Sequence, residues 1–177
     1  MEYRKLPHGE EMISVIGMGS SVVGEQKEAD IIRTVEYALD AGVNYFDMAG
    51  GHATIFPAYG KVMAKRRKEA MMQVHFGADY TTGEYGWTIS LNKVKESIDW
   101  QLENLQTDYI DVGFIHCLDE ESDLHTYEKR NPELYHGPEI AGRCEIYRSV
   151  YACTGTCKQS AGYEHPRYDD VLHQSDV

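Results

Sequence analysis

Apolar and polar positions alternate along the first 128 residues with two different periods. Three segments space their apolar residues as on one helix face and predict helices: residues 28–41, 58–67 and 91–105. Four short apolar runs predict strands: residues 13–18, 44–49, 71–76 and 109–117. Gly17 and Gly19 end the first run, which predicts a tight loop after the first strand.

This alternation predicts an α/β fold, because strands joined through helices pair in parallel with right-handed crossovers. Three of the predicted strands carry a polar residue near the carboxyl end: Asp47, His75 and His116. In a parallel α/β barrel that end is the catalytic face. A Rossmann sheet is the rival, but the loop GMGSSVVG lacks the spacing of a dinucleotide-binding fingerprint. We therefore predict a partial (β/α)8 TIM barrel with about the first four βα units.

The composition changes near residue 128. Residues 129–177 hold three of the four cysteines but only two leucines, and they show no helical or strand periodicity. The sequence thus predicts two regions, an N-terminal half barrel at residues 1–128 and an irregular C-terminal tail at residues 129–177. Cys153 and Cys157 have no second pair of ligands nearby, so we predict no metal site.

Charge and cysteine usage narrow the class of protein further. The chain has 177 residues and a net charge of -12, which argues against a nucleic-acid partner because phosphate binding needs a basic surface. Its apolar runs are too short for a membrane span, and its start lacks the apolar region of a signal peptide. Four cysteines without a secretory signal indicate a reducing compartment. We predict a cytoplasmic protein with no nucleic-acid or membrane partner.

Four stretches of the first 128 residues carry a family resemblance: ISVIGMGSS, ALDAGVNYFDMA, AYGKVMAKRRK and LENLQTDYIDVGFIHC. They resemble the N-terminal half of the aldo-keto reductases, (β/α)8 barrels that use NADPH to reduce carbonyls. The resemblance implies an oxidoreductase with a small carbonyl substrate and NADPH, or NADH, as cofactor. The strings QVHFGADYTTGEYGW and CLDEESDL are similar to a subgroup whose full-length members end in a ferredoxin-like iron–sulfur domain. The cluster motif of that domain is not encoded in this chain.

The resemblance also implies a catalytic group. Tyr59 in AYGK matches the family's proton donor, Asp47 in FDMA the carboxylate that tunes it, and His116 in FIHC the histidine that polarises the carbonyl. His75 stands where the family usually has a lysine. An imidazole is a weaker permanent charge than an ammonium, so it should lower the pKa of the catalytic tyrosine less.

The resemblance further implies cofactor contacts at Gly19, Ser20 and Asp47. Each candidate residue also has a structural interpretation. Asp47 could cap a helix, and Tyr59 could be a half-buried aromatic residue at a helix start. The two histidines could be satisfied members of a core.

The family resemblance extends as far as Glu128. When residues 129–132 are written as codons and one base is dropped, the shifted frame reads NGIL. Carried onward with a choice of permitted synonymous codons, it can read NGILNYIMDLKSQGVVRYIGLSTHVP, which looks like the family's own continuation. We therefore predict that the chain is truncated and translated out of frame after Glu128. The family builds its NADPH site mostly from loops after the seventh and eighth strands, so we expect little or no catalysis. The alternative is a non-catalytic half barrel that self-associates or binds a partner through its open sheet edges.

Overall fold

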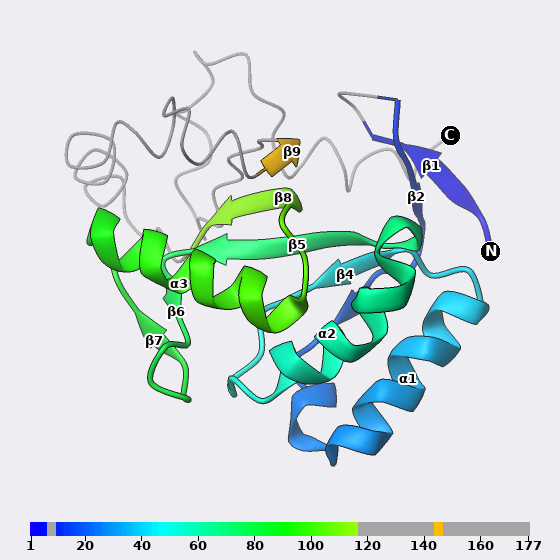
Figure 1. Cartoon of the computed structure of the whole chain (residues 1–177). Helices are drawn as coiled ribbons and strands as arrows, with labels where there is room; N and C mark the ends of the chain where they lie inside the picture. Colours follow the sequence, from blue (N-terminus) through cyan, green and yellow to red (C-terminus); the bar gives the residue numbers. More distant parts are fainter. Residues whose placement is uncertain (7–9, 117–143, 147–177) are drawn as a thin grey trace.

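The computed structural model describes residues 1–6, 10–116 and 144–146 (Figure 1). Its strands are β1 (Tyr3–Lys5), β2 (Met12–Ser14), β3 (Met18–Gly19), β4 (Tyr45–Asp47), β5 (Met71–Phe76), β6 (Ala78–Asp79), β7 (Gly86–Trp87), β8 (Ile110–Ile115) and β9 (Cys144–Ile146). Its α-helices are α1 (Glu28–Asp40), α2 (Ile55–Arg66) and α3 (Leu91–Leu105). Two short 3₁₀ helices, η1 (Val23–Glu25) and η2 (Arg67–Glu69), precede α1 and follow α2.

A parallel sheet in the order β3-β4-β5-β8-β9 forms the centre of the described part. Its register pairs Asp47 of β4 with Gln73 of β5, and His75 of β5 with Phe114 of β8. The helices α1, α2 and α3 lie together on one side of this sheet (Figure 1). The structure therefore confirms the predicted α/β class, with parallel strands joined through helices. None of the helices in these ranges has the length and apolar character needed to cross a membrane.

The two faces of the sheet differ in polarity. Phe46, Val74 and Phe76 are fully buried among the apolar residues of the helices. Because successive residues of a strand point to opposite faces, Asp47 and His75 project from the other face. The helix-facing side thus supplies the main core, and the opposite side carries the polar residues that the sequence singled out.

A close approach between α2 and α3 fixes how the helices pack on the sheet. A Cβ at Gly60 would lie only 2.0 Å from the backbone oxygen of Asn104, so only glycine allows this distance. The apolar face predicted for α3 is buried, with Val94, Ile98 and Leu105 in the core. Gln106 ends α3 in the left-handed conformation, with φ of 53°.

An ion pair between Arg67 and Asp111 ties the amino-terminal ends of β5 and β8 together. The two side chains are each 11% exposed, and Arg67 Nη2 lies 2.6 Å from Asp111 Oδ2. The same carboxylate oxygen accepts the backbone N–H of Met72 at 2.7 Å. Arg67 also donates to the carbonyl oxygens of Ala70 and Tyr109. The pair therefore satisfies backbone groups as well as its own charges.

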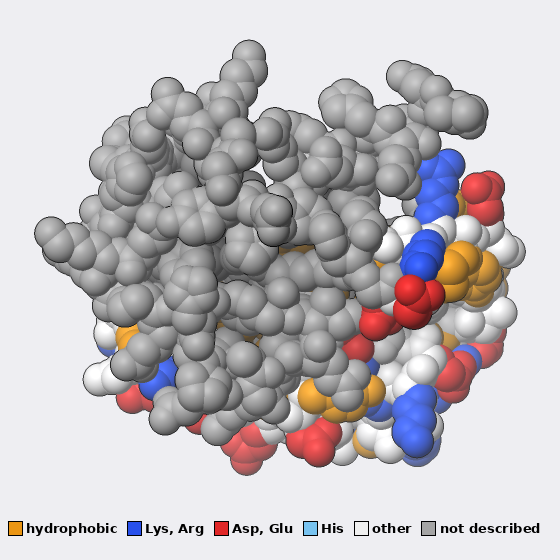
Figure 2. All heavy atoms as spheres, turned by 90° about the horizontal axis from the view of Figure 1, so that it is seen from above, with side chains coloured by type: hydrophobic (Ala, Val, Ile, Leu, Met, Phe, Trp, Pro, Cys, Tyr) orange, Lys and Arg blue, Asp and Glu red, His pale blue; other side chains and the backbone are white. Residues whose placement is uncertain are grey.

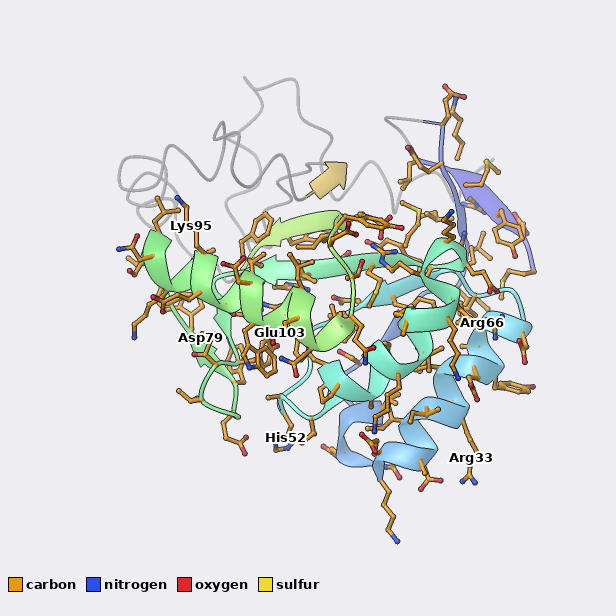
Figure 3. The ribbon with its side chains drawn as sticks, viewed as in Figure 1. Arg33, His52, Arg66, Asp79, Lys95 and Glu103 are labelled. Carbon is orange, nitrogen blue, oxygen red and sulfur yellow. The ribbon has the colours of Figure 1, made fainter. Side chains whose placement is uncertain are left out.

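Acidic and basic side chains are interspersed on the described surface. They lie next to one another on the face seen in Figure 2. Arg66 Nη1, at the end of α2, donates to Asp40 Oδ1 of α1 at 2.7 Å, and Figure 3 shows Arg66 beside that helix. Lys61 Nζ donates to Glu28 Oε1 at 2.7 Å. Two ion pairs thus connect α1 and α2 at the surface.

Three features depart from the elements that the sequence predicts. The run at residues 13–18 is not one strand: its start pairs with β1 in an antiparallel hairpin, and only its end joins the parallel sheet. Val15 and Ile16 between them are exposed, so the apolar pattern there does not mark a buried strand. The hairpin of β6 and β7 was not predicted, because each strand has only two residues. The strand β9 lies in the tail predicted to be irregular and pairs with β8.

The ion pair of Arg67 and Asp111 predicts a large loss of stability when one partner is removed. Asp111→Ala should lower the free energy of unfolding by about 3–5 kcal/mol, because it leaves a buried guanidinium without its counter-charge. Asp108→Asn, at an exposed position just before β8, is the matched control and should change it by no more than about 0.5 kcal/mol. Equal effects of the two variants in chemical denaturation would contradict this role of the pair.

Candidate active site

Asp47, His75 and His116 form one hydrogen-bonded group at the carboxyl edge of the sheet. His75 Nε2 lies 2.7 Å from Asp47 Oδ1, and His75 Nδ1 lies 3.1 Å from Nδ1 of His116. Asp47 ends β4, His75 is near the end of β5, and His116 directly follows β8. These three strands are neighbours in the parallel sheet, so their carboxyl ends bring the three side chains together.

Gln73 of β5 forms a further hydrogen bond with this group. It faces the same side of β5 as His75, and its Nε2 donates to Asp47 Oδ1 at 3.0 Å. Tyr45 donates a short hydrogen bond from its hydroxyl to Gln73 Oε1, which fixes the orientation of the amide. Asp47 therefore accepts from two side chains of β5. These contacts with β5, and not a helix N-terminus, hold the carboxylate of Asp47 in place.

Tyr85 extends the group toward the surface and was missed by the sequence analysis. Its hydroxyl lies 3.0 Å from His116 Nε2, and its ring packs edge-on against the imidazole with centroids 5.8 Å apart. Trp87 Nε1 donates to the backbone oxygen of His116 at 3.2 Å. Both aromatic residues come from the segment GEYGW, whose density of aromatic residues was the available signal.

Two loops hold Tyr85 in this place. The backbone N–H of Tyr85 donates to the oxygen of Gly51 at 3.3 Å, and that of Ala53 donates to the oxygen of Gly83 at the same distance. His52 Nδ1 lies 3.0 Å from Glu84 Oε2 in an exposed pair. Figure 3 shows His52 in the loop after β4. The loop that follows β4 thus braces the loop that carries Tyr85.

The structure does not join Tyr59 to this group by a hydrogen bond. Tyr59 lies within α2 and is fully buried, with its ring edge-on to Phe46. Its hydroxyl has no hydrogen-bond partner among the described residues. Burial, and secondarily the negative charge of Asp47, raise the pKa of Tyr59 well above its ordinary value. The phenol is therefore a weaker acid than a free tyrosine.

The predicted cofactor contacts lie next to Asp47 in the register. Gly19 of β3 pairs with Asp47, and a Cβ on Gly19 would meet no atom within 4 Å. Ser20 is fully buried, and its Oγ accepts the backbone N–H of Ala49 at 2.9 Å. Ser20 therefore stabilises the loop after β4, whereas Gly19 is exposed and borders open space. The described residues contain no group of three or more His, Cys, Asp or Glu placed to hold a metal ion.

The buried hydroxyl of Tyr59 has no hydrogen-bond partner among the described residues, so we expect its removal not to destabilise the protein. Tyr59→Phe should leave the free energy of unfolding unchanged or raise it by about 1 kcal/mol, because a buried hydroxyl without a partner is destabilising. Tyr80→Phe is the control: that hydroxyl donates to the oxygen of Gly50 at 2.9 Å, so its loss should cost about 1 kcal/mol. If thermal denaturation shows the same loss for both, Tyr59 has a partner and this description of its site is wrong.

Comparison with known proteins places the chain in a family. The model of the aldo/keto reductase family matches residues 15–159, which runs past Glu128, where the sequence analysis ends the resemblance. L-galactose dehydrogenase of Arabidopsis thaliana is 33% identical over 132 residues, covering 67% of this chain and 38% of the plant protein. The uncharacterized oxidoreductase YqkF of Bacillus subtilis is 29% identical over 123 residues, covering 66% of this chain and 39% of YqkF. This chain thus spans about two-fifths of the length of these relatives.

The fold agrees with the sequence match. The holo form of the aldo-keto reductase AKR11C1 from Bacillus halodurans superposes with a TM-score of 0.65 and 25% identity, over 84% of this chain and 50% of that protein. The predicted fold class is confirmed: the parallel sheet with its helices matches part of a TIM barrel of this family. The chain belongs to the aldo/keto reductase family.

Proposed function

We propose that this protein is an NAD(P)H-dependent oxidoreductase that reduces the carbonyl group of a small aldehyde or ketone. Membership of the family supports the class of reaction. The observation that carries the proposal is the hydrogen-bonded group of Asp47, His75 and His116. It lies at the carboxyl edge of the parallel strands, where barrels of this type hold their catalytic residues.

The roles follow from the contacts of each side chain. His116 is the member of the group that bonds to a surface residue, Tyr85, so it lies nearest to where a carbonyl oxygen would bind. His75 links His116 to the carboxylate of Asp47, which fixes the orientation of both rings. The position of Tyr59 as proton donor stays a prediction from the family motif.

NADPH or NADH is the cofactor that the family implies. The open space at Gly19, beside Asp47, supports a place for the nicotinamide end. When bound, the cofactor supplies a hydride to the carbonyl carbon. The residues of this chain then position the carbonyl oxygen and provide its proton.

We also propose that this chain by itself has little or no activity. The sheet in the described residues has five strands, whereas the closed barrel has eight and takes about 250 residues. We further propose that residues 129–177 are read out of frame and that the restored protein belongs to the subgroup with a ferredoxin-like iron–sulfur domain. The similarity of the shifted reading to the family's continuation supports the first of these.

The DNA sequence of the gene, from codon 120 to about one kilobase beyond the stop, tests the frame. A single-base shift near codon 128 should open a long frame that ends in a cysteine-rich cluster motif. A gene with no such frame would show that residues 129–177 are the genuine sequence, and the frameshift proposal would fail.

Steady-state oxidation of NADPH with benzaldehyde tests the activity. This chain should show no turnover above background, and the restored protein should show turnover that His116→Gln lowers by at least about 10²-fold. Glu103→Gln, an exposed substitution on α3, is the control and should leave the rate unchanged. Turnover by this chain would refute its inactivity, and a restored protein indifferent to His116→Gln would refute the assigned site.

The open edge of the sheet favours a second candidate, a half barrel that self-associates. Among the described residues β3 pairs only with β4, so one side of the β3 backbone has no strand partner. Exposed Val15 and Ile16 lie shortly before that strand in the sequence. Light scattering should find a dimer or larger species if this edge pairs with a second copy. A monomer would eliminate the candidate.

A further inference from the structure

We infer that Trp87 is a positioning residue of the proposed active site, and that its indole N–H holds the end of β8 so that the ring of His116 stays in contact with His75. The inference rests on the proposed reduction of a carbonyl, in which His116 orients the carbonyl oxygen. The contact that carries it is the hydrogen bond from Trp87 Nε1 to the backbone oxygen of His116, at 3.2 Å. No motif in the sequence assigned a role to Trp87.

The backbone oxygen of His116 lies where the main-chain ladder between β5 and β8 ends. The register pairs Phe76 with Ile115, and the N–H of His116 donates to the oxygen of Phe76 at 2.9 Å. In a parallel pair a residue bonds to the two residues that flank its partner, so the next donor to the oxygen of His116 would be the N–H of Ala78. Ala78 belongs instead to the hairpin of β6 and β7. The indole N–H of Trp87 reaches the oxygen of His116 in place of that next ladder donor.

A glycine turns the chain from β5 into this hairpin. Gly77 has a φ of 107°, a conformation that favours glycine, and a Cβ there would lie 3.0 Å from the oxygen of Thr88. The same Cβ would lie 3.8 Å from the Cβ of His116, so the turn passes beside this histidine. The N–H of Thr88 donates to the oxygen of Gly77 at 2.9 Å and closes the hairpin. Figure 1 shows β6 and β7 near the tips of the β5 and β8 arrows.

The hairpin that carries Trp87 is itself anchored to a helix. Ser97 of α3 is 1% exposed, and its hydroxyl donates to the oxygen of Ala78 at 2.8 Å. Gln101, one turn further along α3, donates to the hydroxyl oxygen of Ser97 at 3.1 Å. Ala78 pairs with Trp87 in the register of β6 and β7. A series of contacts thus connects the buried face of α3, through the hairpin, to the backbone of His116.

The position of the His116 ring depends on this support. Nδ1 of His116 lies 3.1 Å from Nδ1 of His75, and a hydrogen bond is lost when that distance grows by about half an ångström. Loss of the indole donor would let the end of β8 fray and would separate the two rings. A catalytic group that is misplaced by about 1 Å costs roughly 10²-fold in rate. The hydrogen bond from Trp87 therefore contributes to the rate through the position of His116.

Exposure distinguishes Trp87 from the other tryptophan of the chain. Trp87 is 48% exposed. Trp100 instead packs on the rings of Phe56 and Tyr80, with centroids 5.4 and 6.5 Å away. A half-exposed indole contributes less to a core than a packed one. The contact with His116 thus explains an indole at position 87 better than burial does.

Hydrogen exchange of the indole N–H tests the contact in the unmodified chain. The chain has two tryptophans, so its ¹H–¹⁵N spectrum contains two indole signals. Either Trp87→Phe or Trp100→Phe is enough to assign both signals, so the test survives if one variant does not fold. The indole N–H of Trp87 should exchange at least about tenfold more slowly than that of free tryptophan, although its ring is half exposed. Exchange at the rate of free tryptophan would overturn the inference.

The resonances of His116 test the effect on the histidine. Trp87→Phe should move the backbone carbonyl ¹³C resonance of His116 upfield, because the oxygen loses a donor. It should also move the ring ¹⁵N resonances, because the contact with His75 lengthens. Trp100→Phe, the same substitution in the aromatic cluster between the helices, is the matched control and should move neither. A ring spectrum of His116 that Trp87→Phe leaves unchanged would overturn the positioning role.

An isosteric replacement separates the hydrogen bond from packing. β-(3-Benzothienyl)alanine at position 87 keeps the bicyclic ring and has sulfur in place of the N–H. In the restored protein, Trp87→Phe and this analogue should both lower kcat for benzaldehyde by about 10- to 100-fold, with KM within about threefold. An unchanged kcat with the analogue would overturn the inference, because packing alone would then position His116.

The two kinds of measurement keep the inference separate from the proposed function. Slow indole exchange and a His116 spectrum that depends on Trp87, in a restored protein that never oxidises NADPH, would refute the proposed function and leave the structural support of His116 in place. Turnover with a His116 spectrum that is independent of Trp87 would refute the inference and leave the proposed function in place.

Discussion

The parallel pairing of β4, β5 and β8 is the constraint on which the site depends. Parallel strands end at one common edge, so residues far apart in the sequence meet there without any contribution from the loops. Asp47 and His116 are separated by two helices in the chain, yet His75 lies between them and bonds to both. A shift of one residue in the pairing of β5 would turn His75 into the helical core and divide the group.

The two ends of the same strands serve different purposes. At the amino-terminal ends, Arg67 and Asp111 form a buried pair that satisfies backbone groups of β5 and of the segment before β8. At the carboxyl ends, the polar side chains are hydrogen-bonded to one another, and Tyr85 extends this hydrogen-bonded group to the surface. This division is typical of α/β barrels, in which stability and chemistry are assigned to opposite ends of the strands.

Local periodicity predicted much of this arrangement and failed where long-range contacts decide. The bounds predicted for α3 and β5 are those of the structure, because the apolar residues of α3 recur on one helix face and β5 is a short segment of mostly apolar residues. The polar strand ends predicted the meeting of Asp47, His75 and His116. Tyr85 was missed, because its position depends on contacts between two loops. The motif AYGK predicted Tyr59 as the proton donor. The structure gives Gly60 of the same motif a packing role, because α2 and α3 approach closely there.

The central claim is that Asp47, His75 and His116 act as one coupled unit, and transmission across His75 tests it most directly. The measurement is the pair of ¹⁵N resonances of the His116 ring, compared between the unmodified chain and Asp47→Asn. In the described hydrogen bonds Asp47 contacts His75, and His75 contacts His116. The account predicts that Asp47→Asn moves both nitrogen resonances of His116, because the substitution changes the proton position in the intervening ring. A spectrum of His116 that is identical in the two proteins would contradict it.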